Sequence, residues 1–290
     1  MRILATLIAL SVVAACTESP RPASANATPP APALLEIAAA PEQPSNKLEK
    51  AVKPLAGDLD AIVGRGYLRI LVAPSRTHFE TVDGRHRGRA VDAGVALARK
   101  LADDAKRDVT AVFIETREDQ LIASLLANRG DVAANLLLTF TRDEQVAFAP
   151  PIRTGIRELV VTDGGAPLVS LEDVGGRRIT IRANSDHHAS LVRLNEQLKK
   201  NNRRQAVIIT DLTTKTDEEL LDSVNAGRIR ATIVDDYIFD RWAGTLLKIA
   251  STNREIAVSQ DGVVAWATRK EAPALTSVLK DFFATHKLTF

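Results

Sequence analysis

The sequence contains a single cysteine, Cys16, among its 290 residues. A disulfide needs two cysteines and a thiolate metal site needs several, so both are excluded within the chain. Aromatic residues make up only 4% of the composition, which argues against a surface that stacks on sugars or bases. The formal charge is +2 and the basic residues are scattered. We therefore expect no nucleic-acid partner.

The sequence also lacks an apolar run long enough to cross a membrane. Residues 3–13 are apolar, but about eleven residues are too few for a bilayer-spanning helix. A basic start precedes this run and small residues lead directly to Cys16, a pattern that resembles a bacterial lipobox. We predict a lipoprotein signal peptide over residues 1–16, lipidation of Cys16, and a periplasmic protein anchored to the inner or outer membrane. The alternative is an ordinary secretory signal in which the cysteine is incidental.

Residues 17–54 are rich in alanine, proline and serine and show little periodicity. Such a composition buries too little apolar surface to offset the entropy that the chain loses on ordering. We predict a disordered, semi-stiff tether between the lipid and the folded part. A folded helical cap over residues 38–53 is the alternative.

Helical and strand patterns alternate after residue 55. Apolar spacing predicts helices and strands in turn, with helices over 59–63, 91–101 and 118–127 and strands over 67–72, 110–115 and 131–135. This succession implies a parallel sheet with right-handed crossovers. We assign residues 55–152 to the first part of one lobe.

A second α/β set follows. Strands are predicted over 158–162, 178–182, 207–210 and 231–234, with helices over 186–198 and 217–225. After residue 251 we expect the chain to loosen before a last strand over 262–268 and a helix over 273–286. The predicted fold class is α/β with two lobes, in which lobe 2 comprises residues 153–257 and residues 258–290 return to lobe 1. Segments near 149–157 and 253–260 cross between the lobes, and the cleft is the expected ligand site.

Three polar groups are expected to face this cleft. Arg142 follows a strand end, where its planar guanidinium can hold a carboxylate through paired hydrogen bonds. Asn184, Ser185 and Asp186 open a helix whose free N–H groups favour an anion, and Asp235 can accept from an ammonium group. Together they match the polar ends of an α-amino acid or peptide. The alternatives are a surface arginine in a turn, a serine that only caps its helix, and an aspartate that caps the next helix.

The stretch around Arg142 also carries a family resemblance. Thr139, Arg142, Val146 and Phe148 match a signature of family 3 periplasmic solute-binding proteins. Within that family, residues 131–135, 224–227, 231–236 and 265–270 most resemble the N-terminal sensing module of membrane-bound lytic transglycosylase F. The resemblance implies a type II periplasmic-binding-protein fold and ligand contacts from Phe79, Thr139, Arg142, Ser185 and Asp235.

Two positions depart from the family pattern. Arg89 and Ala90 stand where the family has an apolar residue followed by an acid. His187 and His188 follow the anion-binding turn, where the transglycosylase relatives have aromatic residues. We interpret the two histidines as exposed first-turn residues rather than metal ligands, because neither a cysteine nor a carboxylate partner is evident.

The sequence predicts a non-enzymatic, lipid-anchored binding protein that delivers an amino acid or small peptide to an ABC importer. The alternative is a muropeptide-sensing regulatory module acting on a separate transglycosylase, because the transglycosylases continue into a catalytic domain and this sequence stops at Phe290. A third reading is an enzyme, since the family includes dehydratases, but no cluster of general acid and base residues supports it. We expect no catalytic residue, metal or cofactor.

Overall fold

The computed structural model describes residues 49–164, 168–183, 185–213, 216–244 and 250–286. All of these residues belong to one compact unit that spans residues 39–290. The predicted signal peptide, Cys16 and most of the predicted tether lie outside the described residues. No helix in the described ranges is long and apolar enough to cross a membrane.

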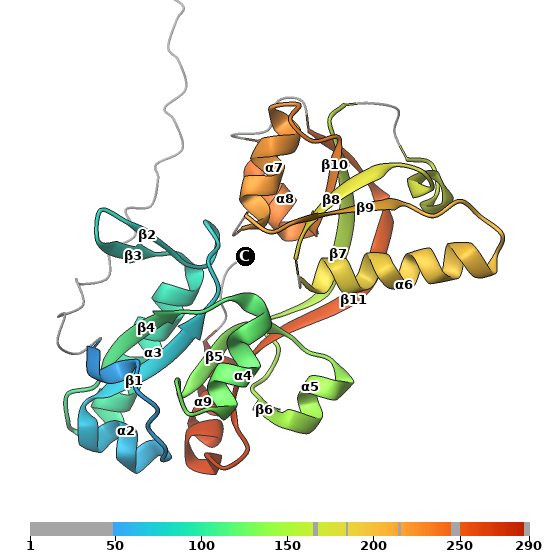
Figure 1. Cartoon of the computed structure of the whole chain (residues 1–290). Coiled ribbons are helices and arrows are strands. Elements are labelled where there is room, and N and C mark those ends of the chain that lie inside the picture. Colours follow the sequence, from blue (N-terminus) through green and yellow to red (C-terminus); the bar gives the residue numbers. More distant parts are fainter. Residues whose placement is uncertain (1–48, 165–167, 184, 214–215, 245–249, 287–290) are drawn as a thin grey trace, which may run out of the picture. The chain divides into compact units, whose positions relative to one another are not determined.

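Lobe 1 is built on three parallel strands (Figure 1). Strand β1 lies between β4 and β5, which confirms the predicted parallel succession. In chain order the lobe contains α2 (Leu59–Arg65), β1 (Tyr67–Val72), β2 (Glu80–Val82), β3 (Arg85–Arg87), α3 (Arg89–Ala105), β4 (Thr110–Glu115), η1 (Glu118–Gln120), α4 (Leu121–Leu126), β5 (Val132–Leu137), α5 (Phe140–Gln145), β6 (Val146–Phe148) and, at the end, α9 (Pro273–Thr285).

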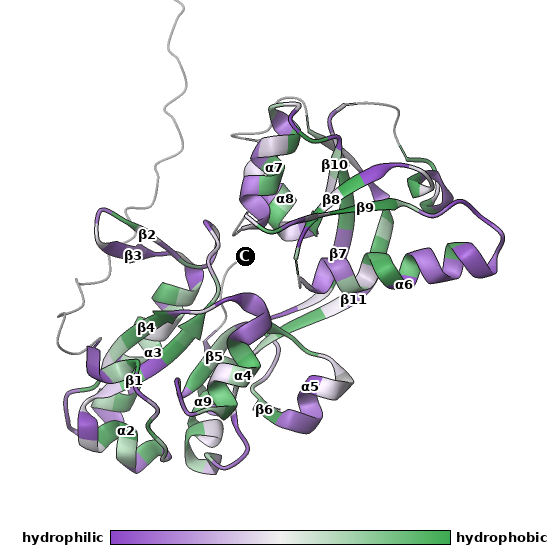
Figure 2. Cartoon of the chain, viewed as in Figure 1, coloured by the Kyte–Doolittle hydropathy of each residue, from purple (hydrophilic) through white to green (hydrophobic). Residues whose placement is uncertain are grey.

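Helix α3 packs closely on this sheet. Its buried side chains include Val91, Leu97 and Leu101, which recur at helical spacing and face the core. A Cβ at Gly94 would lie 2.6 Å from Ile70 Cδ1 and 2.7 Å from Phe113 Cε1, so a larger residue here would require both side chains to shift. Figure 2 shows the parallel strands β1, β4 and β5 largely in green, as expected for strands covered by helices.

Lobe 2 contains a parallel pair of strands and an antiparallel pair. Strand β8 pairs with β9 in parallel, and β10 pairs with β7 (Arg153–Thr162) in the antiparallel sense. The elements of this lobe are η2 (Leu171–Val174), β8 (Arg178–Arg182), α6 (Asp186–Lys200), β9 (Val207–Asp211), α7 (Asp217–Asn225), β10 (Ala231–Asp235) and α8 (Asp236–Ala243). Helix α6 alternates between green and purple in Figure 2, because one face packs on the lobe and the other is exposed.

Two long strands connect the lobes: β7 (Arg153–Thr162) and β11 (Ser251–Arg269). They pair with each other, and β11 also pairs with β5 and β6 in lobe 1. The expectation that the chain loosens after residue 251 is therefore wrong. Register shifts interrupt the β7–β11 pairing at several places, and such irregularities break the two-residue alternation by which a strand is recognised.

The predicted tether ends too late, because residues 49–55 fold onto lobe 1. Ala51 is fully buried. The guanidinium of the buried Arg69 donates to the carbonyl of Leu55 at 2.7 Å and to the carboxylate of Asp131 at 2.8 Å. A buried arginine needs acceptors for all its donors, and the segment before residue 56 supplies several of them.

Candidate ligand-binding site

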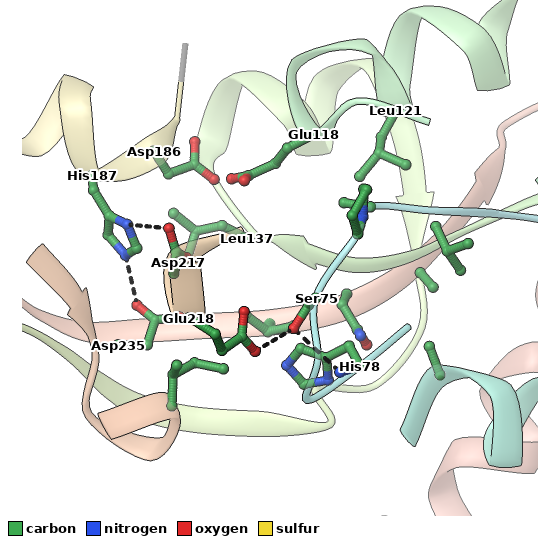
Figure 3. A pocket seen from close by; sticks show the side chains of 18 of the residues that line it. Ser75, His78, Glu118, Leu121, Leu137, Asp186, His187, Asp217, Glu218 and Asp235 are labelled. Atoms are coloured by element: carbon green, nitrogen blue, oxygen red, sulfur yellow. Dashed lines mark hydrogen bonds and ion pairs between the residues drawn. The ribbon is translucent and has the colours of Figure 1, made fainter. Parts of the chain in front are cut away.

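A cavity of about 100 Å³ lies between lobe 1 and lobe 2 (Figure 3). Carboxyl side chains dominate its polar lining: Glu118, Glu158, Asp186, Asp217, Glu218 and Asp235. The volume is below the roughly 300–1,000 Å³ of pockets for drug-sized ligands. Only a very small ligand can enter unless the two lobes move apart.

Arg142 already holds a carboxylate, and that carboxylate belongs to the protein. Thr139 caps helix α5 by accepting from the backbone N–H of Arg142. The two terminal nitrogens of Arg142 donate to Asp186 Oδ2 and Oδ1 at 2.9 and 2.8 Å, and one of them also donates to the carbonyl of Leu137. Asp186 opens helix α6 in lobe 2. The Arg142 guanidinium, which we predicted to hold a ligand carboxylate, thus joins the two lobes through Asp186.

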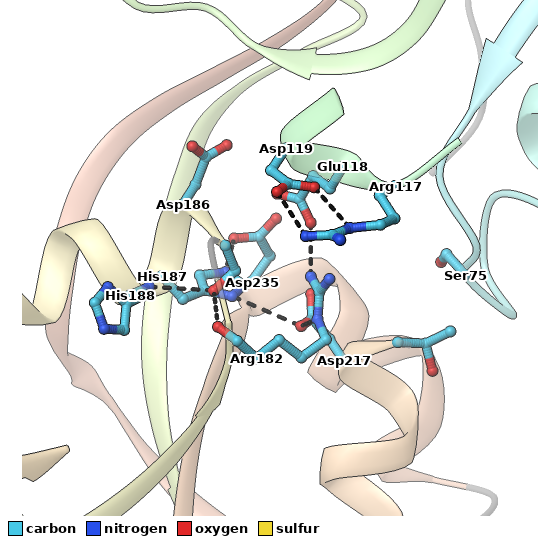
Figure 4. Close-up of polar contacts among 12 residues, drawn as sticks. Ser75, Arg117, Glu118, Asp119, Arg182, Asp186, His187, His188, Asp217 and Asp235 are labelled. Carbon is cyan, nitrogen blue, oxygen red and sulfur yellow. Dashed lines mark hydrogen bonds and ion pairs between the residues drawn. The ribbon is translucent and has the colours of Figure 1, made fainter. Parts of the chain in front are cut away.

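A second arginine also crosses the cleft (Figure 4). Arg182 ends β8 in lobe 2 and donates to Glu118 of lobe 1 and to Asp217 of lobe 2, both at 2.7 Å. Burial raises the pKa of Glu118 although Arg182 opposes this effect. Burial would also raise the pKa of Asp217, but Arg182 and His187 outweigh it and hold that pKa below its usual value.

His187 is buried at 6% exposure, so the expectation of an exposed first-turn histidine is wrong for this residue. Its Nε2 lies 3.1 Å from Asp235 Oδ1 and its Nδ1 lies 3.8 Å from Asp217 Oδ1. Burial alone would lower the pKa of His187, but Asp217 and Asp235 raise it well above its usual value. Two carboxylates thus favour the protonated, cationic form of the ring. His188 is partly exposed.

In the turn before helix α6 of lobe 2, the Ser185 hydroxyl already forms hydrogen bonds within the protein. Ser185 caps α6 by accepting from the backbone N–H of His188 at 3.2 Å, which confirms the capping role, and its hydroxyl donates to the carbonyl of Arg182. Asp235 precedes α8 but makes no side-chain cap, and it lines the cavity. Asn184 lies outside the described residues.

Phe79 lies in the core of lobe 1 rather than in the cavity. It is 1% exposed, and its ring packs against Phe113 with the centroids 5.9 Å apart. The same loop instead presents Ser75 and His78 to the cavity. A β-hairpin formed by β2 and β3 follows Phe79, and the Phe79 ring packs against His86 of this hairpin.

Contacts from this loop reach lobe 2. Ser75 Oγ donates to Glu218 Oε1 at 2.8 Å (Figure 3), and His78 Nε2 lies 3.0 Å from the hydroxyl of Tyr237. Burial, with Arg89 and Arg241 nearby, lowers the pKa of His78 to about 3. The imidazole is neutral in this environment, and it bridges the lobes through a hydrogen bond rather than through charge.

Sequence reasoning missed several residues of the cleft: Glu118, Glu158, Arg182, Asp217 and Glu218. Arg182 ends a predicted strand, and Glu118 and Asp217 each follow one. A polar residue at or after a strand end is the signal that identified Arg142 and Asp235. Glu158 gave no such signal, because it lies inside a strand that the sequence shows only as an apolar run.

The sequence profile of the bacterial extracellular solute-binding proteins, family 3, matches residues 68–287. The chain belongs to this family. The family resemblance of the residues around Arg142 is thereby confirmed, as is the two-lobed α/β fold class.

This family 3 protein has curated relatives that are longer. It is 30% identical over 189 residues to a membrane-bound lytic murein transglycosylase F from Maricaulis maris, and the alignment covers 63% of this chain and 38% of the relative. The chain thus spans well under half the length of that relative. The match supports the resemblance to the N-terminal module of these proteins.

Solved structures with the same architecture include two reconstructed ancestral proteins. One is the amino acid-binding protein AncCDT-1, a precursor of cyclohexadienyl dehydratase, with 21% identity, a TM-score of 0.60, and coverage of 78% of this chain and 91% of that one. The other is an ancestral arginine-binding protein bound to arginine, with 19% identity, a TM-score of 0.60, and coverage of 76% and 92%. At these identities the likeness shows the fold alone.

Proposed function

We propose that this family 3 protein binds an amino acid or a small peptide in the cleft between its lobes, without catalysing a reaction. The observation that carries the proposal is the Arg142 guanidinium, which projects into the interlobe space and binds a carboxylate through two parallel hydrogen bonds. A ligand carboxylate would take the same position after displacing Asp186. The amino-acid-binding ancestral protein of the same fold supports this ligand class.

We propose in addition that the protein acts in the periplasm as a lipoprotein attached through Cys16. The support is the sequence pattern before Cys16 and the extracellular character of the family. In this role it would pass its ligand to an ABC importer. No cofactor or metal ion is required for such binding.

The test is a thermal-shift screen against the amino acids, dipeptides and purified muropeptides, followed by calorimetric titration. A ligand at 100 times its Kd stabilises the folded state by about 2.7 kcal/mol, which a melting curve resolves. Saturable binding of an amino acid or dipeptide supports the proposal. Failure of every amino acid and peptide to bind refutes it.

The second candidate function is a muropeptide-sensing module that regulates a lytic transglycosylase. The similarity to the lytic murein transglycosylase F favours it. In that case muropeptides bind in the screen and free amino acids do not. Cleavage of peptidoglycan by an added lytic transglycosylase would then change when this protein is present.

A further inference from the structure

The carboxyl groups that line the interlobe cavity outnumber the cations that pair with them. Asp186 pairs with Arg142, Glu118 and Asp217 share Arg182, and Asp235 pairs with His187. Across the described ranges, Glu158 and Glu218 form no ion pair. The six carboxyl groups of the cavity lining thus pair with three cations, Arg182 and His187 in the lining and Arg142 outside it, and the excess of negative charge points to a positively charged ligand.

One of these carboxyl groups, that of Glu158, has an oxygen atom without a hydrogen-bond partner among the described residues. The residue is 6% exposed and lies on β7, and its Oε1 accepts from Ser190 Oγ at 3.0 Å. Its other oxygen, Oε2, is buried and has no hydrogen-bond partner among the residues that the structure describes. A buried acceptor without a partner destabilises the protein, and an N–H group of a ligand can supply that partner.

Asp235, the residue predicted to bind an ammonium group, is already engaged. It lies directly opposite Glu158 in the antiparallel β7–β10 pair, so the two carboxyl groups are cross-strand neighbours. Like charges directly opposite each other destabilise a sheet. His187 compensates Asp235 through its Nε2 contact, whereas Glu158 keeps an oxygen for an external cation.

We propose that the ligand is a basic amino acid and that Glu158 Oε2 accepts a hydrogen bond from its cationic side-chain group. This inference rests on the proposed amino-acid-binding function of the same cleft. Glu158 and Asp235 also line an adjacent cavity of about 220 Å³ beside the crossing strands, where the one cation among the described lining residues, Arg193, donates to Ser190 Oγ. The side chain of a basic amino acid has room to extend there, while its carboxylate replaces Asp186 on Arg142.

Burial raises the pKa of the Glu158 carboxyl group, and Asp235 and Asp186 add to this rise, although His187 and the hydrogen bond from Ser190 oppose it. An approaching cation favours the ionised carboxylate and lowers that pKa. Binding of a basic amino acid therefore releases a proton in the pH range where Glu158 is partly protonated. This release is a second readout that needs no variant.

The experiment is calorimetric titration of the full chain with two matched pairs of ligands, L-arginine with L-citrulline and L-lysine with L-norleucine. We expect the basic member of each pair to bind at least about tenfold more tightly, since it adds one charge-assisted hydrogen bond in a buried site. Titration in two buffers of different ionisation enthalpy measures the proton released with arginine.

The isosteric variant Glu158→Gln keeps the acceptor for Ser190 and removes the charge. It should weaken arginine binding about thirtyfold or more, the lower end for loss of one partner of a buried charge pair, and change citrulline binding little. The control is Glu172→Gln, which removes a carboxylate of lobe 2 that is 51% exposed and pairs with Arg203 at the surface. It should leave both affinities unchanged.

Tighter or equal binding of the neutral ligands overturns the inference but leaves the proposed amino-acid-binding function standing. An arginine preference that persists in Glu158→Gln, in a variant that melts as the parent does, also overturns the assignment of Glu158. If that variant does not fold, the absence of proton release on binding of arginine by the parent overturns it. Failure of all amino acids to bind refutes the proposed function together with this inference.

Discussion

The interlobe ion pair between Arg142 and Asp186 predicts an unusual effect of a single substitution. Both oxygens of Asp186 accept hydrogen bonds from the Arg142 guanidinium. Asp186→Asn retains the shape but offers one acceptor, and its amide N–H₂ faces the donors of the arginine. The ion pair that competes with a ligand carboxylate is thereby removed.

The structure sets the size of the effect. The side chains of Arg142 and Asp186 are 21% and 27% exposed. An exposed ion pair contributes about 0–1 kcal/mol, and breaking a buried pair costs about 3–5 kcal/mol. A partly exposed pair should contribute an intermediate free energy. We take about 1–2 kcal/mol for this pair. A difference of about 1.4 kcal/mol corresponds to a tenfold change in affinity.

We therefore expect Asp186→Asn to bind a carboxylate-bearing ligand about tenfold more tightly than the parent, as measured by calorimetric titration. Arg142→Ala should weaken binding both alone and combined with Asp186→Asn, because the guanidinium that holds the ligand carboxylate is lost. The matched control is Asp222→Asn, since Asp222 forms another interlobe ion pair, with Arg76 at 2.8 Å. That variant should not increase the affinity.

Two results would refute this reasoning. Weaker binding by Asp186→Asn would mean that Asp186 stabilises the ligand-bound form rather than competing with the ligand. An equal increase in Asp222→Asn would mean that any loss of interlobe contact raises affinity, so that competition at Arg142 is not the cause.

Three further predictions concern other parts of the chain. Because the pKa of His187 is higher in the folded than in the unfolded protein, its protonation stabilises the fold. This stabilisation is fully present below the unfolded pKa of about 6.5 and is lost as the pH rises through the folded pKa. In denaturant unfolding, the difference in stability between the parent and His187→Gln should therefore shrink above about pH 6.5. Arg69→Met should lower the free energy of unfolding by about 1–3 kcal/mol, because Asp131 loses its fully buried partner and keeps only the ion pair with Arg65, and a loss below about 1 kcal/mol would contradict the structural role assigned to this pair. Cys16→Ser should move the protein from the membrane to the soluble fraction, and a variant that stays on the membrane after a high-salt wash would exclude lipid anchoring through Cys16.

The sequence by itself determined the features that depend on neighbouring residues. Ser185 caps α6 and Ser170 forms the capping box of η2, because a cap needs only N–H groups within the next turn. Asp83 and Gly84 form the turn between β2 and β3, both with positive φ, and an Asp-Gly pair is typical of such a turn. The alternation of strand and helix patterns likewise indicated the parallel sheet of lobe 1, since a crossover helix between consecutive strands leaves few other topologies.

Only the tertiary structure decided which side chains meet in the cleft. Arg142 and Asp186 are 44 positions apart in the chain, and the β7–β10 register alone places Glu158 beside Asp235. The direction of Phe79 depends on its packing against Phe113. A side chain's partners across lobes follow from strand register and lobe closure, which are set by the summed packing of distant segments. The residue types could therefore be named from the sequence, but their pairing could not.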